Sequence, residues 1–150
     1  KFLQLSGIRE IYEQKRTHDQ VKQILSCLQS RVAEFNNLQL DQAFVYEAML
    51  QAAKHGIVEF IDAMKMANPD LLWTVDSRKR NIFSYAVLHR KQNVFRLINT
   101  LSGRKAIVKY HEDVFGNNML HLAAHLGPSS DLNERPGAAL QMQRELQWFK

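Results

Sequence analysis

The sequence predicts an all-α protein built from stacked helix pairs, because of its composition, its hydrophobic spacing and an internal repeat. Only 6 glycines and 3 prolines occur among 150 residues, and residues of high helix propensity are abundant. Three segments align when Ala52, Ala86 and Ala123 are placed in register, at spacings of 34 and 37 residues. A period of this length is typical of proteins made from repeated supersecondary units.

The first element, residues 1–40, is expected to be an N-terminal helical cap or linker. Apolar residues recur there at helical spacing and predict one or two helices within residues 8–34. These residues are Ile8, Ile11, Tyr12, Val21, Ile24, Leu25, Leu28 and Val32. Because the end of a stack of repeats otherwise exposes an apolar face, we expect this region to cover that end.

The first repeat, residues 41–75, reads as two antiparallel helices. Gly56 is expected to take the left-handed conformation that ends the first helix. The second helix is expected to end before Asn68-Pro69, since proline cannot continue it. The predicted buried positions are Phe44, Ala48, Met49, Ala52 and Ala53 on the first helix, and Val58, Phe60, Ile61 and Met64 on the second.

The second repeat, residues 76–112, follows the same pattern. Arg90 stands where the first repeat has Gly56, so the turn between its two helices is expected to differ. An aspartate precedes the second repeat and another precedes the third, at Asp76 and Asp113. The predicted buried positions are Phe83, Ala86 and Val87, then Val94, Phe95, Leu97 and Ile98.

The third repeat, residues 113–150, contains a polar excursion from Pro128 to Arg135 before its second helix. A spacing of three, four and three residues predicts one buried face on that helix. This face comprises Ala139, Met142, Leu146 and Phe149. We expect Phe149 to pack on the repeat and Trp148 to be the freer aromatic residue.

The segment DVFGNNMLHLAAHLG, residues 113–127, resembles the ankyrin pattern D-x-x-G-x-T-P-L-H-x-A-A-x-x-G. Asn118 and Met119 replace the Thr-Pro pair of that pattern. The resemblance implies an ankyrin-repeat solenoid in which the aspartate and glycine shape a finger turn. It also implies that His121 bonds locally and steadies neighbouring repeats. The matching residues are Asp113, Gly116, Leu120, His121, Ala123, Ala124 and Gly127.

The segment GNNMLHLAAHLGP followed by PGAALQMQRELQWFK is similar to plant ankyrin-repeat proteins of the accelerated-cell-death kind. The N-terminal IREIYEQKRTHDQVKQIL also looks like the helix that precedes their last repeats. The resemblance implies a place in defence and stress signalling. It further implies a PGG-type membrane domain beyond Lys150, which would hold this part at the cytoplasmic face of a membrane.

A solenoid of this kind is expected to act as a non-enzymatic module for protein–protein interaction or as a scaffold. Such proteins bind their partners with their finger turns and with exposed positions of their first helices. For this chain we expect a protein partner, which the sequence does not identify. The expected contact residues are Ser77, Arg78, Lys79, Arg80, Gln51, Lys54, Tyr85, His89, Glu112, Val114 and Phe115.

The net charge of +5 is concentrated in one segment, since residues 76–110 carry nine basic side chains and only Asp76 as an acid. A solvated loop surface explains this pattern, and so does an acidic partner or an anionic membrane surface. Nucleic acid is disfavoured because the sequence has no reader motif or aromatic platform. The alternative function is a basic adaptor that docks on anionic membrane lipid or nucleic acid through residues 78–109. Its candidate patch is Arg78, Lys79, Arg80, Arg90, Lys91, Arg104, Lys105 and Lys109.

No pattern predicts catalysis, a cofactor or a small-molecule substrate. His121 and His125 are four residues apart, but the segment HLAAH lacks the glutamate of a metalloprotease helix, and no third ligand is identifiable. Cys27 is the single cysteine, which excludes an intrachain disulfide. A lone helical cysteine is more often buried than paired with a histidine such as His18 or His55 for catalysis.

Overall fold

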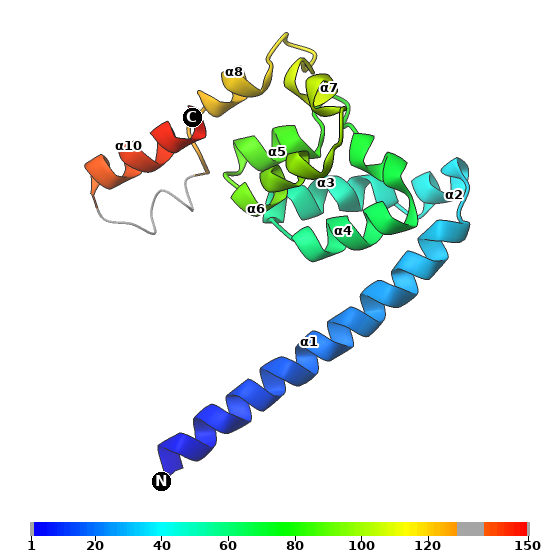
Figure 1. Ribbon diagram of the computed structural model, residues 1–150, viewed down its shortest axis with the longest axis vertical. Coiled ribbons are helices and arrows are strands. Elements are labelled where there is room, and N and C mark those ends of the chain that lie inside the picture. Colours follow the sequence, from blue (N-terminus) through cyan, green and yellow to red (C-terminus); the bar gives the residue numbers. More distant parts are fainter. Residues whose placement is uncertain (1, 129–136, 150) are drawn as a thin grey trace.

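The computed structural model describes residues 2–128 and 137–149. Every regular element in these ranges is helical, and their only extended pairing is an isolated antiparallel bridge between Val75 and Asn81. The predicted all-α class is therefore confirmed. One long helix projects from a body of short helices (Figure 1). Within the described ranges, none of the helices combines the length and the apolar character that crossing a bilayer requires.

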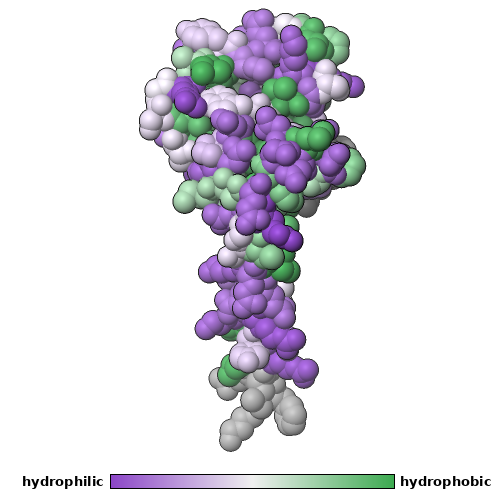
Figure 2. All heavy atoms as spheres, turned by 90° about the vertical axis from the view of Figure 1, so that its right-hand side faces the viewer, coloured by the Kyte–Doolittle hydropathy of each residue, from purple (hydrophilic) through white to green (hydrophobic). Residues whose placement is uncertain are grey.

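The N-terminal region is one helix, α1, from Phe2 to Glu34. At about 1.5 Å per residue it extends about 50 Å, whereas α4 (Val58–Ala67), against which it packs, has only 10 residues. Most of α1 therefore extends beyond the body, and Figure 2 shows hydrophilic side chains over most of this projection. Val32 near its C-terminal end is buried.

The predicted N-terminal cap is thus wrong in its extent. Of the apolar residues that marked it, Leu25 is half-buried. The others, apart from Val32, are exposed. Ile8, Ile11 and Tyr12 lie on the projecting part of the helix, whereas Val21, Ile24 and Leu28 lie on either side of the half-buried Leu25.

Two short helices follow, α2 (Asn37–Gln42) and α3 (Val45–His55). Asn36 and Gln39 form a reciprocal capping box at the start of α2. Phe44 lies in the turn between α2 and α3 with φ 54° and is exposed. Its predicted place on the buried face of α3 was therefore wrong. Gly56 ends α3 with φ 82°, as predicted.

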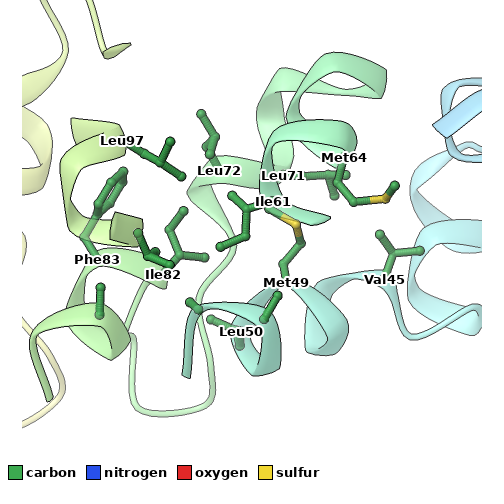
Figure 3. Close-up of a cluster of buried hydrophobic side chains, with 14 of the residues drawn as sticks. Val45, Met49, Leu50, Ile61, Met64, Leu71, Leu72, Ile82, Phe83 and Leu97 are labelled. Atoms are coloured by element: carbon green, nitrogen blue, oxygen red, sulfur yellow. The ribbon is translucent and has the colours of Figure 1, made fainter. Parts of the chain in front are cut away.

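The first helix pair, α3 and α4, holds the main hydrophobic core together with the 3-10 helix η1 (Pro69–Trp73). Met49 and Ile61 point toward each other from the two helices, and both are completely buried (Figure 3). Leu71 of η1 belongs to the same core, is 1% exposed and lies beside Met64 (Figure 3). Burying side chains of this size stabilises the fold by about 1.5–3 kcal/mol each.

The second pair consists of α5 (Ile82–Leu88), α6 (Gln92–Phe95) and the 3-10 helix η2 (Arg96–Thr100). Phe83 and Val94 are fully buried, and Leu97 is nearly so. They extend the core of the first pair, since α5 packs directly on α3.

The turn after α5 resembles the turn after α3 but differs from it in detail. Arg90 takes a left-handed φ of 54°. The Lys91 N–H donates to the Ala86 carbonyl at 2.8 Å, as the Ile57 N–H donates to the Ala52 carbonyl at 2.9 Å. The Arg90 N–H, however, donates to the Val87 carbonyl at 3.2 Å, whereas the Gly56 N–H donates to the Ala52 carbonyl at 2.8 Å. The expected difference in detail between the two turns is therefore present. Other contacts of Arg90, described below, offset the cost of a left-handed non-glycine residue.

The chain then forms α7 (Lys105–Lys109), α8 (Met119–Ala123), α10 (Ala138–Leu146) and the 3-10 helix η3 (Gln147–Phe149). α8 packs on α5, so that α3, α5 and α8 follow one another in a row. The predicted buried face of the last helix was wrong, because Ala139, Met142 and Leu146 are exposed. The side chain of Phe149 and the polar excursion after Pro128 lie outside the described residues.

Candidate interaction surface

The first finger turn, residues 76–80, is closed by its own aspartate. The Asp76 Oδ1 accepts hydrogen bonds from the N–H groups of Arg78 and Arg80 at 2.8 and 2.7 Å. The N–H of Asp76 in turn donates to the Arg80 carbonyl at 3.0 Å. Lys79 completes the turn with φ 59°. One carboxylate thus satisfies two backbone donors in a turn that projects from the helices.

The second finger turn, residues 113–117, repeats this geometry 37 positions later. The Asp113 Oδ1 accepts from the N–H groups of Phe115 and Asn117 at 2.9 and 3.0 Å. Gly116 has φ 75° and occupies the place of Lys79. The turn expected from Asp113 and Gly116 is therefore present. The aspartate recurs in both fingers, while the glycine is replaced by a strained lysine in the first.

The two fingers are joined to each other. The Arg80 Nε and Nη2 atoms each lie 3.1 Å from the Asp113 Oδ2. The N–H of Val114 donates to the Arg78 carbonyl at 3.0 Å. The Asp113 side chain is only 1% exposed and that of Arg80 is 17% exposed, so water screens this pair less than a surface pair. The fingers therefore form one preorganised unit.

The environment of Asp113 favours its charged form. Burial of the carboxylate opposes ionisation, but hydrogen bonds from the backbone N–H groups of Asn117 and Phe115 and from Arg80 outweigh it. Together they lower the pKa of Asp113 to about 2. The Asp113 carboxylate is therefore ionised at neutral pH, and it holds Arg80 in the finger unit.

The tips of the fingers carry the expected contact residues. Arg80 is an exception, because its guanidinium is engaged with Asp113. His111 approaches the first finger through a hydrogen bond between its Nε2 and the Lys79 carbonyl oxygen. The exposed tip residues are Ser77, Arg78, Lys79, Glu112, Val114 and Phe115.

The predicted contact positions on the first helices separate into two groups. Tyr85 donates its hydroxyl hydrogen bond to the Asp76 Oδ2 at 3.1 Å, so it adjoins the first finger, and its ring stacks on His89 with the centroids 5.9 Å apart. Burial and the nearby Asp76 carboxylate raise the pKa of the Tyr85 hydroxyl. Gln51 lies elsewhere and lines a separate apolar groove beneath α1, while Lys54 is half-buried on the same helix, α3.

Arg90 does not belong to the basic patch. It is only 6% exposed, and its guanidinium forms an ion pair with Glu145 of α10. It also donates to the backbone carbonyl oxygens of Val87, Ala123 and His125 at 2.6, 3.1 and 2.5 Å. Sequence reasoning missed this role, since Glu145 lies 55 positions away and carries no local signal.

Gly127 and Trp148 both pack close to the Arg90 side chain. A Cβ atom at Gly127 would lie 3.2 Å from the Arg90 Cγ and 3.1 Å from the Glu145 Oε1, so this motif glycine permits close packing. Trp148 lies 5.6 Å from the Arg90 guanidinium and meets Phe95 edge-to-face at 6.1 Å. It is half-buried. Because the side chain of Phe149 lies outside the described residues, the prediction that Trp148 is the freer of the two stays a prediction.

Two of the remaining basic residues border an apolar cavity that we name the lysine groove, with a volume of about 790 Å³. Arg78, Lys79, Arg104, Lys105 and Lys109 are exposed, and Lys91 is half-buried. Only Lys105 and Lys109 of this set line the groove. Its lining residues are Val87, Phe95, Ile98, Lys105, Ala106, Lys109, Tyr110, Asn118, Met119, Leu120, Ala123 and Trp148.

His121 makes the expected local bond within its own repeat. Its Nδ1 accepts from the Asn118 N–H at 3.2 Å, while Asn118 caps α8 through the His121 N–H. α8 ends at Ala123, so His125 lies beyond the helix that was expected to align the two imidazoles. In the part of the chain that the structure describes, no three His, Cys, Asp or Glu side chains cluster to suit a metal.

One further expectation was wrong. Cys27 is exposed rather than buried, because this part of α1 turns one face to solvent. In the ankyrin-like motif, Ala123 is buried, but Leu120 is 60% exposed and Ala124 is also exposed. No family model matches the chain, and comparisons with curated proteins and with solved structures gave no significant match.

Proposed function

We propose that this chain is a non-enzymatic interaction module that binds a protein partner through its joined finger turns. The observation that carries the proposal is the Arg80–Asp113 pair, which fixes two projecting turns relative to each other. Because the tips are held before a partner arrives, binding loses little conformational entropy. The exposed Phe115 and Arg78 give the tips an aromatic and a cationic contact, and aromatic residues and arginine are enriched at protein interfaces.

We further propose that the module is an ankyrin-type solenoid from a plant membrane-associated protein of defence or stress signalling. Support comes from the resemblance of residues 113–127 to the ankyrin pattern. The recurrence of the finger hydrogen bonds after 37 residues adds to it, as does the row of helices α3, α5 and α8.

The test is a pull-down from plant extract with two matched variants. The finger variant carries Arg78→Ser, Lys79→Gly and Phe115→Ser, and the control carries Tyr12→Ser, Lys15→Ser and Arg16→Ser on the projecting part of α1. All six side chains are exposed, so both variants should fold. Specific proteins should be captured by the parent and the control but not by the finger variant. Capture that is the same with all three proteins would contradict the proposal.

A second candidate function is docking on an anionic membrane surface. It is favoured by the exposed Arg78, Lys79, Lys105 and Lys109, because each basic residue near such a surface adds about 1 kcal/mol. Liposome co-sedimentation tests it. Binding should require anionic lipid, fade with salt and fall in an Arg78→Ser, Lys79→Ser variant that leaves Arg80 intact. Equal recovery with neutral and anionic vesicles would return these residues to a solvated-surface role.

A further inference from the structure

The repeat register shows that one face of α8 is uncovered. Met49, Phe83 and Leu120 occupy the same position in successive repeats, and the first two are completely buried whereas Leu120 is 60% exposed. One helical turn later, Val87 is 3% exposed, while its counterpart Ala124 is exposed. The same positions thus pack in the first two repeats and face solvent in the third. Leu120 lies in the lysine groove.

The chemistry of this groove favours one kind of occupant. Its floor is apolar and includes Phe95, Ile98 and Met119, and its edge carries Lys105 and Lys109. None of the described residues that line it has a carboxylate. An apolar floor with two ammonium groups at the edge matches a partner that presents apolar side chains beside acidic ones.

The chain's own last helix is a poor match for the groove. α10 has exposed apolar side chains, including Met142 and Leu146, but its single acidic residue is Glu145. That carboxylate is already paired with the buried Arg90 guanidinium. Docking α10 in the groove would therefore bring no free carboxylate to the two lysines.

We propose that the lysine groove binds an acidic amphipathic helix of a partner protein. The apolar side of that helix covers Leu120 and Met119, and its carboxylates pair with Lys105 and Lys109. A helix fits because the first two repeats each place a second helix, α4 and α6, beside their first helix. This inference rests on the proposed interaction function and assigns a chemical class to the partner.

The test uses three fluorescein-labelled synthetic peptides of about 18 residues, long enough to form an amphipathic helix. The first has a leucine face flanked by glutamates, the second has lysine for every glutamate, and the third is a scramble of the first. Binding to the full chain is measured by fluorescence anisotropy at low and physiological salt. The variants are Lys105→Glu with Lys109→Glu, Leu120→Asp, and a control with the same charge change, Lys15→Glu with Arg16→Glu on α1.

The acidic amphipathic peptide should bind the parent and the control, and the scrambled and basic peptides should bind at least tenfold more weakly. The groove variants should each weaken binding of the acidic peptide about tenfold, since reversed charges or a desolvated carboxylate oppose it. All substituted side chains are exposed, so circular dichroism should confirm that the variants fold.

Equal affinity for the acidic and scrambled peptides, or equal losses in the control and the groove variants, would overturn the inference. The inference would also be overturned if Lys105 and Lys109 bound phosphatidylserine vesicles while the chain failed to bind the acidic peptide. A dimer that Leu120→Asp dissociates would assign the face to a second copy instead. If the groove fails these tests while the finger variant still abolishes partner capture, the interaction function stands and only this site is wrong.

Discussion

At the scale of single residues, the fingers depend on aspartates that act on backbone groups. Asp76 and Asp113 each accept two N–H bonds within their own turn. Asp113 has the additional task of holding Arg80 across the two turns. Loss of its charge would therefore loosen both fingers, whereas loss of Lys79 or Phe115 at the tips would alter only what a partner meets.

Acidification is expected to destabilise the fold through Asp113. Its pKa falls from the ordinary value of 3.8 to about 2 on folding, so between these values the unfolded chain binds a proton that the folded chain does not. The stabilisation is fully present only well above the ordinary pKa of 3.8, and it is lost as the pH falls toward about 2. Urea unfolding across this range should show a smaller pH dependence for Asp113→Asn than for the parent. Identical pH dependence would contradict this role.

His121→Ala should lower the free energy of unfolding by about 1 kcal/mol, because it removes one half of the cap at the start of α8. His125→Ala is the matched control, since that residue is an exposed histidine beyond the helix, and it should change stability little. Urea unfolding measures both. Metal analysis should give the same zinc content for parent and variant, and stoichiometric zinc that disappears in His121→Ala would instead reveal a metal site.

At the scale of elements, Arg90 attaches α10 to the helix row. Its guanidinium contacts carbonyl oxygens of α5 and of the chain around the end of α8, as well as Glu145 of α10. The same residue adopts the left-handed backbone conformation that ends α5. A buried charge with several acceptors thus replaces the glycine of the first repeat and joins three helices.

Two substitutions separate these roles. Arg90→Ala should cost about 3 kcal/mol, because it loses the buried ion pair and keeps the strained backbone. Arg90→Gly also loses the pair, but it should be about 1 kcal/mol less damaging since glycine tolerates positive φ. Both should expose α10 to proteolysis and shift the fluorescence of Trp148 toward that of a solvated indole. Arg104→Ala is the control, because the Arg104 side chain is exposed. Equal effects of all three substitutions on stability and proteolysis would contradict the proposed attachment of α10 by Arg90.

At the scale of the whole molecule, the projecting part of α1 is separable from the body. Its described side chains from Ile8 to Arg16 are exposed, whereas Val32 belongs to the core. Removal of residues 1–16 should therefore leave the urea midpoint nearly unchanged, although the helical signal falls. Val32→Asp should lower the midpoint strongly because it buries an unpaired charge. A large loss of stability on truncation would show that the projection supports the body.

The sequence by itself determined the features that depend on near neighbours. The helical class, the register of 34 and 37 residues and the stop at Gly56 follow from propensity and spacing. The turn built by Asp113 and Gly116, which the ankyrin resemblance implied, is also local, because its hydrogen bonds join residues no more than four positions apart. A local pattern contains all the partners that such features require.

Only the tertiary structure decided which side chains are buried, because burial depends on partners that are distant in sequence. Arg90 is buried by Glu145 and by carbonyl oxygens at least 33 positions away. The apolar residues on the projecting part of α1 remain exposed because α4 is too short to reach them, and Leu120 remains exposed because nothing in the described chain packs where the earlier repeats have a neighbour. The exposure of a residue depends on which elements pack against each other, and the hydrophobic periodicity of one element does not specify its neighbours.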